Sequence, residues 1–211
     1  IPFPPSELFA QLPWRREIIE GLLGADLVGF HTDGGAQNFL ALTARYLGMQ
    51  PDATGVTVPS LRSGLRRVTV GAFPISIDTA EYDAIARTAE VQDHALEIRA
   101  ALGDPKRLLL GVDRLDYTKG IDVRLKAFTE LLDDGSIAPG EAAFVQIATP
   151  SRENVEDYQR LRDEIDLMVG RLVGAHGVLG APPIQYFHQP FAREDLVAFY
   201  VAADVMLVTP Y

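Results

Sequence analysis

The sequence reads Leu108-Leu109-Leu110-Gly111-Val112 and continues Asp113-Arg114-Leu115-Asp116-Tyr117-Thr118-Lys119-Gly120. The first five residues form an apolar run of strand length. Beyond the polar segment, apolar residues recur every three or four positions from 121 to 132, which is typical of an amphipathic helix. A strand that is apolar on both sides and is followed by such a helix begins a βαβ unit. This stretch therefore predicts a parallel sheet with helices on both faces.

The same alternation runs to the end of the chain. Further strands are predicted over 143–148, 184–187 and 205–208, and further helices over 155–172 and 193–203. Toward the N-terminus the pattern is weaker, with strands over 26–30, 56–58 and 68–73 and helical segments over 14–23, 35–47 and 79–103. We therefore expect an α/β fold with two Rossmann-like domains, residues 1–78 and residues 79–211.

Composition excludes several classes of protein. The chain has 211 residues, of which 47% are hydrophobic and 23% charged, as in an ordinary globular protein. A net charge of −10 argues against binding to nucleic acid or to an anionic membrane. The absence of cysteine excludes disulfides and thiol nucleophiles, and it fits a cytoplasmic location. Four scattered histidines without a paired ligand spacing predict no metal site, and no cofactor is indicated.

The two ends of the sequence indicate a piece of a longer protein. Ile1 opens an apolar, proline-rich stretch without an initiator Met, and the predicted strand 205–208 is followed by only three residues. The first twenty residues lack the basic and apolar regions of a signal peptide, and no apolar run reaches 18 residues. We expect that the first domain is only partly present, that the second is truncated, and that neither enters a membrane.

The segment after the first strand of the second domain is the strongest candidate site. Ligands of open α/β sheets bind outside the carboxyl ends of the strands, where a helix N-terminus offers free N–H groups to an anion. Arg114 and Lys119 add two positive charges there, which suits a diphosphate that gains charge as it leaves. The alternative is that Arg114 only pairs with Asp113 or Asp116. The glycines match neither G-x-G-x-x-G nor a P-loop.

Two further segments follow predicted strands. In Thr149-Pro150-Ser151-Arg152, the first two residues suit the N-cap and first position of a helix, which would put Arg152 in its first turn as a phosphate-ester ligand. Alternatively Arg152 pairs with Glu153 or Glu156. After strand 184–187, Pro190 and Phe191 could present backbone groups to a nucleobase, although a loop that needs Pro for its turn explains them equally well.

The stretch Arg114-Leu115-Asp116-Tyr117-Thr118-Lys119-Gly120 resembles a motif of the trehalose-6-phosphate synthases, a family of retaining glycosyltransferases of the GT-B type. Other stretches resemble family segments in the family order, namely 1–7, 26–30, 73–78, 148–152 and 204–210. The resemblance implies an enzyme that transfers glucose from a nucleotide diphosphate glucose, UDP-glucose or GDP-glucose, to glucose 6-phosphate. The implied product is trehalose 6-phosphate, formed with retention at the anomeric carbon.

The resemblance also implies a role for each candidate. Arg114 and Lys119 match the residues that bind the donor diphosphate and stabilise its charge, and Arg152 matches an arginine that helps hold the acceptor phosphate. Pro190 and Phe191 match backbone that meets the nucleobase. Residues 1–78 would belong to the acceptor-side domain, and residues 79–211 to the nucleotide-sugar domain. In the implied front-face mechanism the departing phosphate oxygen takes the proton of the acceptor hydroxyl, so that no metal is required.

Parts of the family site are missing from this sequence. A glycine-rich donor loop and a His that would precede Ile1 are not in it, and Tyr211 stands where the family continues toward Arg-Asp-Gly-Met-Asn. Two alternatives stay open. One is a related transferase with another acceptor, such as a glucosylglycerol-phosphate synthase or an aminocyclitol-coupling relative, and the other is a non-catalytic regulator that binds sugar phosphates. The resemblance leaves the donor base undecided and allows a homo-oligomer.

Overall fold

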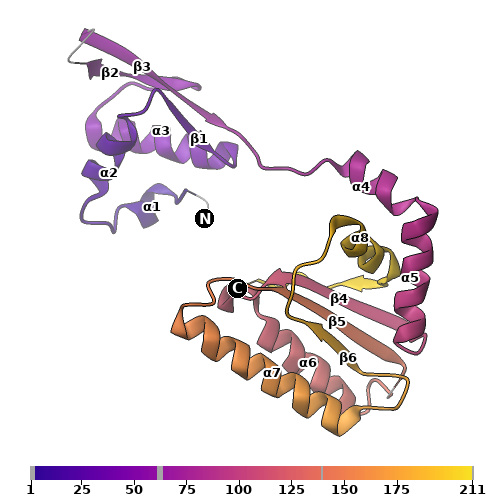
Figure 1. Ribbon diagram of the computed structural model, residues 1–211. Coiled ribbons are helices and arrows are strands. Elements are labelled where there is room, and N and C mark those ends of the chain that lie inside the picture. The colour runs from indigo at the N-terminus through magenta and orange to yellow at the C-terminus, as the bar shows by residue number, and fades with distance from the viewer. Residues whose placement is uncertain (1–2, 61–63, 139, 211) are drawn as a thin grey trace. The chain divides into compact units, whose positions relative to one another are not determined.

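The computed structural model describes residues 3–60, 64–138 and 140–210 (Figure 1). Residues 1–2, which belong to the resembling stretch 1–7, and Tyr211 lie outside the described residues. Contacts divide the chain into two compact units, residues 1–77 and 78–211. Each unit has a sheet and an apolar core of its own, and each is described by itself.

The N-terminal unit holds one three-stranded sheet and its helices. Its elements are α1 (Ser6–Phe9), α2 (Arg15–Leu22), β1 (Leu27–Phe30), α3 (Asp33–Leu47), β2 (Gly55–Ser60) and β3 (Gly64–Ala72). The strand order is β1-β3-β2, with β1 parallel and β2 antiparallel to β3. The antiparallel pair differs from the expected parallel sheet because only three residues separate β2 from β3, whereas a parallel crossover needs a dozen or more.

One face of this sheet carries the core. Val56 and Val58 on β2 and Val68 and Val70 on β3 are buried, while residues between them are mostly exposed. They pack in a single cluster with apolar residues of β1 and the three helices, among them Phe39, which is fully buried. The alternation of buried and exposed positions is that of a sheet with one covered face.

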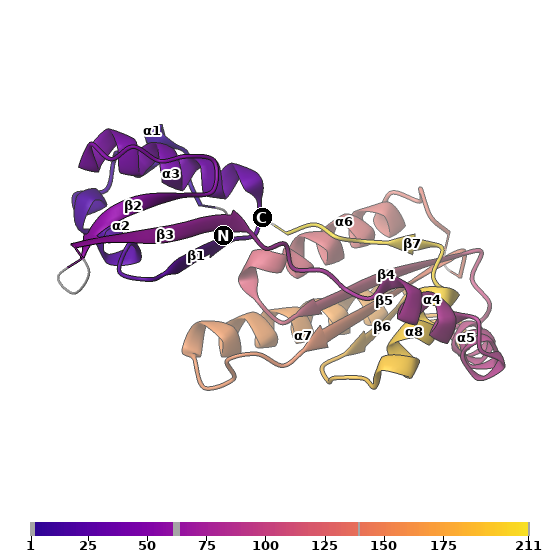
Figure 2. The ribbon, with the colours of Figure 1, turned by 90° about the horizontal axis from the view of Figure 1, so that it is seen from above.

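The C-terminal unit has the predicted alternation of strands and helices. Its elements are α4 (Thr79–Ala86), α5 (Ala89–Ala101), β4 (Arg107–Arg114), the 3₁₀ turn η1 (Tyr117–Lys119), α6 (Ile121–Asp133), β5 (Ala142–Thr149), α7 (Glu156–His176), β6 (Ile184–Phe187), α8 (Arg193–Ala202) and β7 (Val205–Met206). The strand order is β6-β5-β4-β7, and every pair is parallel (Figure 2).

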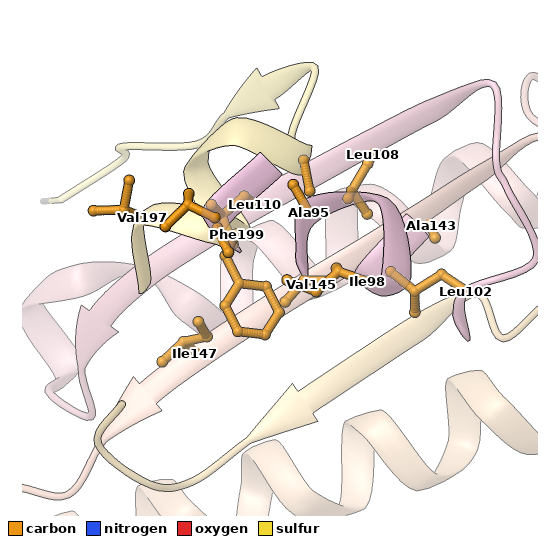
Figure 3. Packing of buried hydrophobic residues seen from close by; sticks show 13 residues of the cluster. Ala95, Ile98, Leu102, Leu108, Leu110, Ala143, Val145, Ile147, Val197 and Phe199 are labelled. Atoms are coloured by element: carbon orange, nitrogen blue, oxygen red, sulfur yellow. The ribbon is translucent and has the colours of Figure 1, made fainter. Parts of the chain in front are cut away.

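Helices cover both faces of this sheet (Figure 1). On one face, residues of β4 and β5 such as Leu110 and Val145 pack with Ile98 of α5 and Phe199 of α8 (Figure 3). On the other face, Phe144 packs with residues of α6 and α7 in a second cluster. The first seven residues of β5 are all buried, as expected of a strand between two helical layers. The α/β fold with a parallel sheet and helices on both faces is thus confirmed in this unit.

Within the described ranges, no helix combines the length and the apolar character that crossing a lipid bilayer requires.

Candidate functional site

The predicted site segments follow three neighbouring strands of the second sheet. The first lies after β4, the second after β5 and the third after β6. Because parallel strands end at the same edge of a sheet, these loops meet at one edge, where ligands of open α/β sheets bind. The Tyr158 side chain connects the first two loops, because its hydroxyl forms hydrogen bonds with Asp116 and with Arg152.

The loop after β4 is held by its own side chains. The Asp116 carboxylate accepts hydrogen bonds from the Thr118 backbone N–H (2.9 Å) and from the Thr118 hydroxyl (2.7 Å). Gly120 ends η1 and precedes α6 with φ 63°, in the left-handed region that glycine adopts without strain. The loop therefore turns sharply into α6. Arg114 is the last residue of β4, and Lys119 lies two residues before α6 begins.

The two cations differ in their surroundings. The Arg114 side chain is 58% exposed, and its Nη2 lies 3.6 Å from Asp116 Oδ2. Asp113, the other partner considered for Arg114, instead pairs with Arg124. Lys119 is half-buried, and its ammonium has no ion-pair partner in the part of the chain that the structure describes. Both cations therefore keep hydrogen-bond donors for a ligand.

Asp116 is the buried anion of the loop. Its side chain is 8% exposed. The two hydrogen bonds from Thr118 lower the pKa of the Asp116 carboxyl, and the Tyr158 hydroxyl and the Arg114 charge act in the same direction. The carboxylate is therefore ionised at neutral pH, and it can accept hydrogen bonds but cannot donate one.

Arg124, which the sequence did not single out, holds the loop in place from its position on α6. Its side chain is 4% exposed. Its Nη2 donates to Asp113 Oδ2 (2.5 Å) and to the Lys119 carbonyl (2.8 Å). Its Nη1 donates to the Leu207 carbonyl (3.2 Å) and to Gln146 Oε1 (3.3 Å).

The sequence did carry a signal for this residue. Arg124 stands three residues after Ile121 and four before Phe128, so it lies on the apolar stripe of α6.

Gly111 leaves room for this network. A Cβ at this position would lie 2.3 Å from Gln146 Oε1 and 2.6 Å from Arg124 Nη1. Such distances exclude any side chain unless the network shifts. The glycine in the middle of β4 is therefore explained by a close approach of side chains from β5 and α6.

The helix start that the capping pattern at Thr149 and Pro150 predicted is wrong, whereas the apolar spacing from residue 155 onward agrees with α7. Thr149 is the last residue of β5, and its carbonyl accepts from the Leu115 N–H (2.8 Å), so that it completes the sheet and does not cap a helix. Arg152 adopts φ 48°, in the left-handed region, and α7 begins only at Glu156. Arg152 therefore lies in a loop at the edge of the sheet and not in the first turn of a helix.

Arg152 is exposed, and its partner is an aromatic residue. Its Nη1 donates to the Tyr158 hydroxyl (3.2 Å), and the guanidinium carbon lies 5.6 Å from the centre of the Tyr158 ring. Among the described residues neither Glu153 nor Glu156 pairs with Arg152, although both were considered as partners. The guanidinium keeps further N–H donors for an anion, since arginine has five in all.

The loop after β6 holds the remaining candidates. Pro190 is exposed. The ring of Phe191 packs against Phe187 and Phe199, with both ring centroids 5.1 Å away. No hydrogen bond within the described residues uses the Phe191 backbone. The ring thus anchors a loop whose backbone N–H and C=O are open to a ligand.

Residues 3–60, 64–138 and 140–210 contain no group of three His, Asp or Glu side chains that could hold a metal ion. The groups of the candidate site are the side chains of three cations, Arg114, Lys119 and Arg152, together with backbone N–H and C=O groups and the buried Asp116 carboxylate.

Comparison with known proteins gives consistent matches over the whole chain. The family model described as glycosyltransferase family 20 matches residues 1–211. The chain is 61% identical to a protein of Mycolicibacterium gilvum named trehalose-6-phosphate synthase, and the match covers all of this chain and 42% of that protein.

Two solved structures are similar in fold. One is an α,α-trehalose-phosphate synthase (UDP-forming) from Burkholderia xenovorans in complex with glucose 6-phosphate, with a TM-score of 0.78, 31% identity, and coverage of 100% of this chain and 46% of that one. The other is from E. coli and is bound with UDP-2-fluoro glucose, with a TM-score of 0.76, 30% identity, and coverage of 100% and 45%. This chain thus spans less than half the length of the relatives it matches.

Proposed function

Because the chain belongs to glycosyltransferase family 20, we propose that the protein transfers a glucosyl unit from a nucleotide diphosphate glucose to glucose 6-phosphate and forms trehalose 6-phosphate with retention. The observation that carries this proposal is the pair Arg114 and Lys119, both with donors left for a ligand, at the carboxyl end of β4 beside the start of α6. The 61% identity to a protein with that name supports it. The cysteine-free sequence fits a reducing compartment, and the cytoplasm is the proposed location.

The donor is assigned to the loops after β4 and β6. Arg114 and Lys119 bind the diphosphate, whose charge rises as its bond to the sugar breaks, so both cations bind the transition state more tightly than the ground state. The start of α6 adds oriented N–H groups. The open backbone at Phe191, with Pro190 before it, meets the nucleobase. Backbone recognition does not choose between uracil and guanine by itself.

The acceptor is assigned to the loop after β5. Arg152 forms a charge-assisted contact with the phosphate of glucose 6-phosphate. In the proposed front-face step, the bond between the anomeric carbon and the diphosphate oxygen breaks, and the acceptor hydroxyl oxygen forms its new bond on the same face. The departing oxygen takes the proton of that hydroxyl. Charge and protons then balance without a covalent intermediate.

The deciding experiment is an assay of the full-length protein with glucose 6-phosphate and, in separate reactions, UDP-glucose and GDP-glucose. We expect trehalose 6-phosphate as the product and a clear preference for one donor. Turnover only with another acceptor would contradict the substrate assignment and favour a related transferase. Binding of sugar phosphate without any transfer would favour a non-catalytic regulator.

A further inference from the structure

A continuous line of polar contacts joins the two cations assigned to different substrates. Arg152 Nη1 donates to the Tyr158 hydroxyl oxygen (3.2 Å), and this hydroxyl donates to Asp116 Oδ2 (3.2 Å). The same carboxylate oxygen lies 3.6 Å from Arg114 Nη2. Two side chains therefore connect the loop after β4 with the loop after β5, although 42 residues separate Tyr158 from Asp116.

The middle of this line is buried and its ends are exposed. Tyr158 is 5% and Asp116 is 7% exposed, whereas Arg114 and Arg152 reach solvent. The second carboxylate oxygen, Oδ1, is already taken by the two hydrogen bonds from Thr118. The other oxygen, Oδ2, makes the contacts outside this turn: it accepts a hydrogen bond from the Tyr158 hydroxyl and forms the ion pair with Arg114.

We propose that Asp116 and Tyr158 are positioning residues that couple donor binding to acceptor binding. The inference rests on the proposed function for the identity of the two substrates. When a diphosphate attracts the Arg114 guanidinium, the loose contact between Arg114 and Asp116 weakens. Oδ2 then has the Tyr158 hydroxyl as its remaining partner, and that hydrogen bond strengthens.

The effect passes on to Arg152. A hydroxyl that donates more strongly is also a better acceptor, because neighbouring hydrogen bonds in a chain polarise one another. The Tyr158 oxygen therefore holds Arg152 Nη1 more firmly, and the remaining N–H groups of this guanidinium are oriented for the acceptor phosphate before it arrives. Less ordering has to occur on binding, so the donor nucleotide increases the affinity for glucose 6-phosphate.

The test measures binding and not turnover. Calorimetry on the full-length protein gives the dissociation constant of glucose 6-phosphate without nucleotide and with saturating UDP or GDP, whichever binds more tightly. We expect the nucleotide to tighten binding at least about fivefold in the wild type, the lower end of common coupling factors. In Tyr158→Phe, which keeps the ring under Arg152 and removes only the hydroxyl, the factor falls toward one. By reciprocity, glucose 6-phosphate also stops tightening nucleotide binding.

Two more variants make the result specific. Asp116→Asn can still accept from Thr118 through its remaining oxygen but presents an NH₂ group where Oδ2 was, and we expect the same loss of coupling. Tyr186→Phe is the matched control, because the Tyr186 hydroxyl is buried without a hydrogen-bond partner in the described structure. It should keep the wild-type factor. Thermal melting of all variants shows that they are folded.

Each outcome bears on one hypothesis. A wild-type factor of one, or an unchanged factor in folded Tyr158→Phe, would overturn the coupling. A protein that makes no trehalose 6-phosphate but shows coupling that Tyr158→Phe removes would refute the proposed reaction and support the coupling through Tyr158. Loss of the factor in Tyr186→Phe would show that any loss of a buried hydroxyl suffices, and it would also overturn the role of Tyr158.

Discussion

Arg114 and Lys119 contribute positive charge, and neither side chain belongs to the apolar clusters of the second unit. Arg114 is more than half exposed, so Arg114→Ala should leave the fold intact. In the full-length protein we expect Arg114→Ala and Lys119→Ala each to lower kcat by at least about 100-fold, as when a donor to developing charge is removed. Steady-state kinetics with the preferred nucleotide sugar measure this. Turnover near the wild-type value in both variants would contradict the diphosphate assignment.

Arg152 is expected to act on the other substrate. Loss of a charge-assisted hydrogen bond costs about 1.5 to 3 kcal/mol, so Arg152→Ala should raise the KM for glucose 6-phosphate by roughly 10- to 150-fold. The KM for the nucleotide sugar should change much less. Initial rates with each substrate varied in turn separate the two effects. Equal changes in both KM values would place Arg152 in support of the loop instead.

At the scale of elements, Arg124 joins β4, α6 and the residue after β7 through one buried guanidinium. Arg124→Met removes the partner of the Asp113 carboxylate, which is 11% exposed. Removing one member of a buried pair typically costs about 3 to 5 kcal/mol in the free energy of unfolding. Denaturant titration measures this cost. The matched control is Arg160→Met, because the Arg160–Glu156 pair on α7 is exposed, and its loss should cost at most about 1 kcal/mol.

The contacts of Asp204 with α5 and β4 depend on pH. Asp204 Oδ2 accepts from the Leu108 N–H (2.7 Å) and from Arg99 Nη1 (3.1 Å), and these contacts, that of Leu108 first, lower the pKa of the Asp204 carboxyl. A lowered folded-state pKa means that the stabilisation is present above the unfolded pKa of about 3.9 and is lost as pH falls through the folded value.

We therefore expect Asp204→Asn to lower the free energy of unfolding at pH 7 and to lose less stability than the wild type when the pH is reduced below about 4. Denaturant titration at pH 7, 5 and 3 tests the sign. A difference between the two proteins that is constant over this range would show that the Asp204 charge contributes nothing.

At the scale of the whole molecule, all five candidate residues lie in the second compact unit, residues 78–211. We expect UDP or GDP to slow hydrogen exchange of the full-length protein mainly in residues 113–121 and 190–193, and glucose 6-phosphate to add protection in residues 150–155. Mass spectrometry of peptic peptides resolves these segments. Nucleotide protection confined to residues 1–77 would contradict the assignment of the donor to the second unit.

The sequence by itself determined the alternation of strands and helices in the second unit, because apolar spacing is a local property that each segment carries alone. It also singled out Arg114 and Lys119, since the signal was a short motif at a strand end. The capping pattern in residues 149–152 was misleading about the start of α7, because the sheet overrides it when Thr149 pairs with β4. Local propensity yields where a tertiary hydrogen bond competes for the same backbone.

Only the tertiary structure decided which side chains meet. Arg124 and Gln146 are 22 residues apart, and Tyr158 and Asp116 are 42 apart, and no periodicity in the sequence links either pair. They meet because β4 and β5 pair in parallel and end at one edge, which brings the loop after each strand beside the other. The cations could be read from the residues, but the buried groups that orient them depend on contacts between distant parts of the chain.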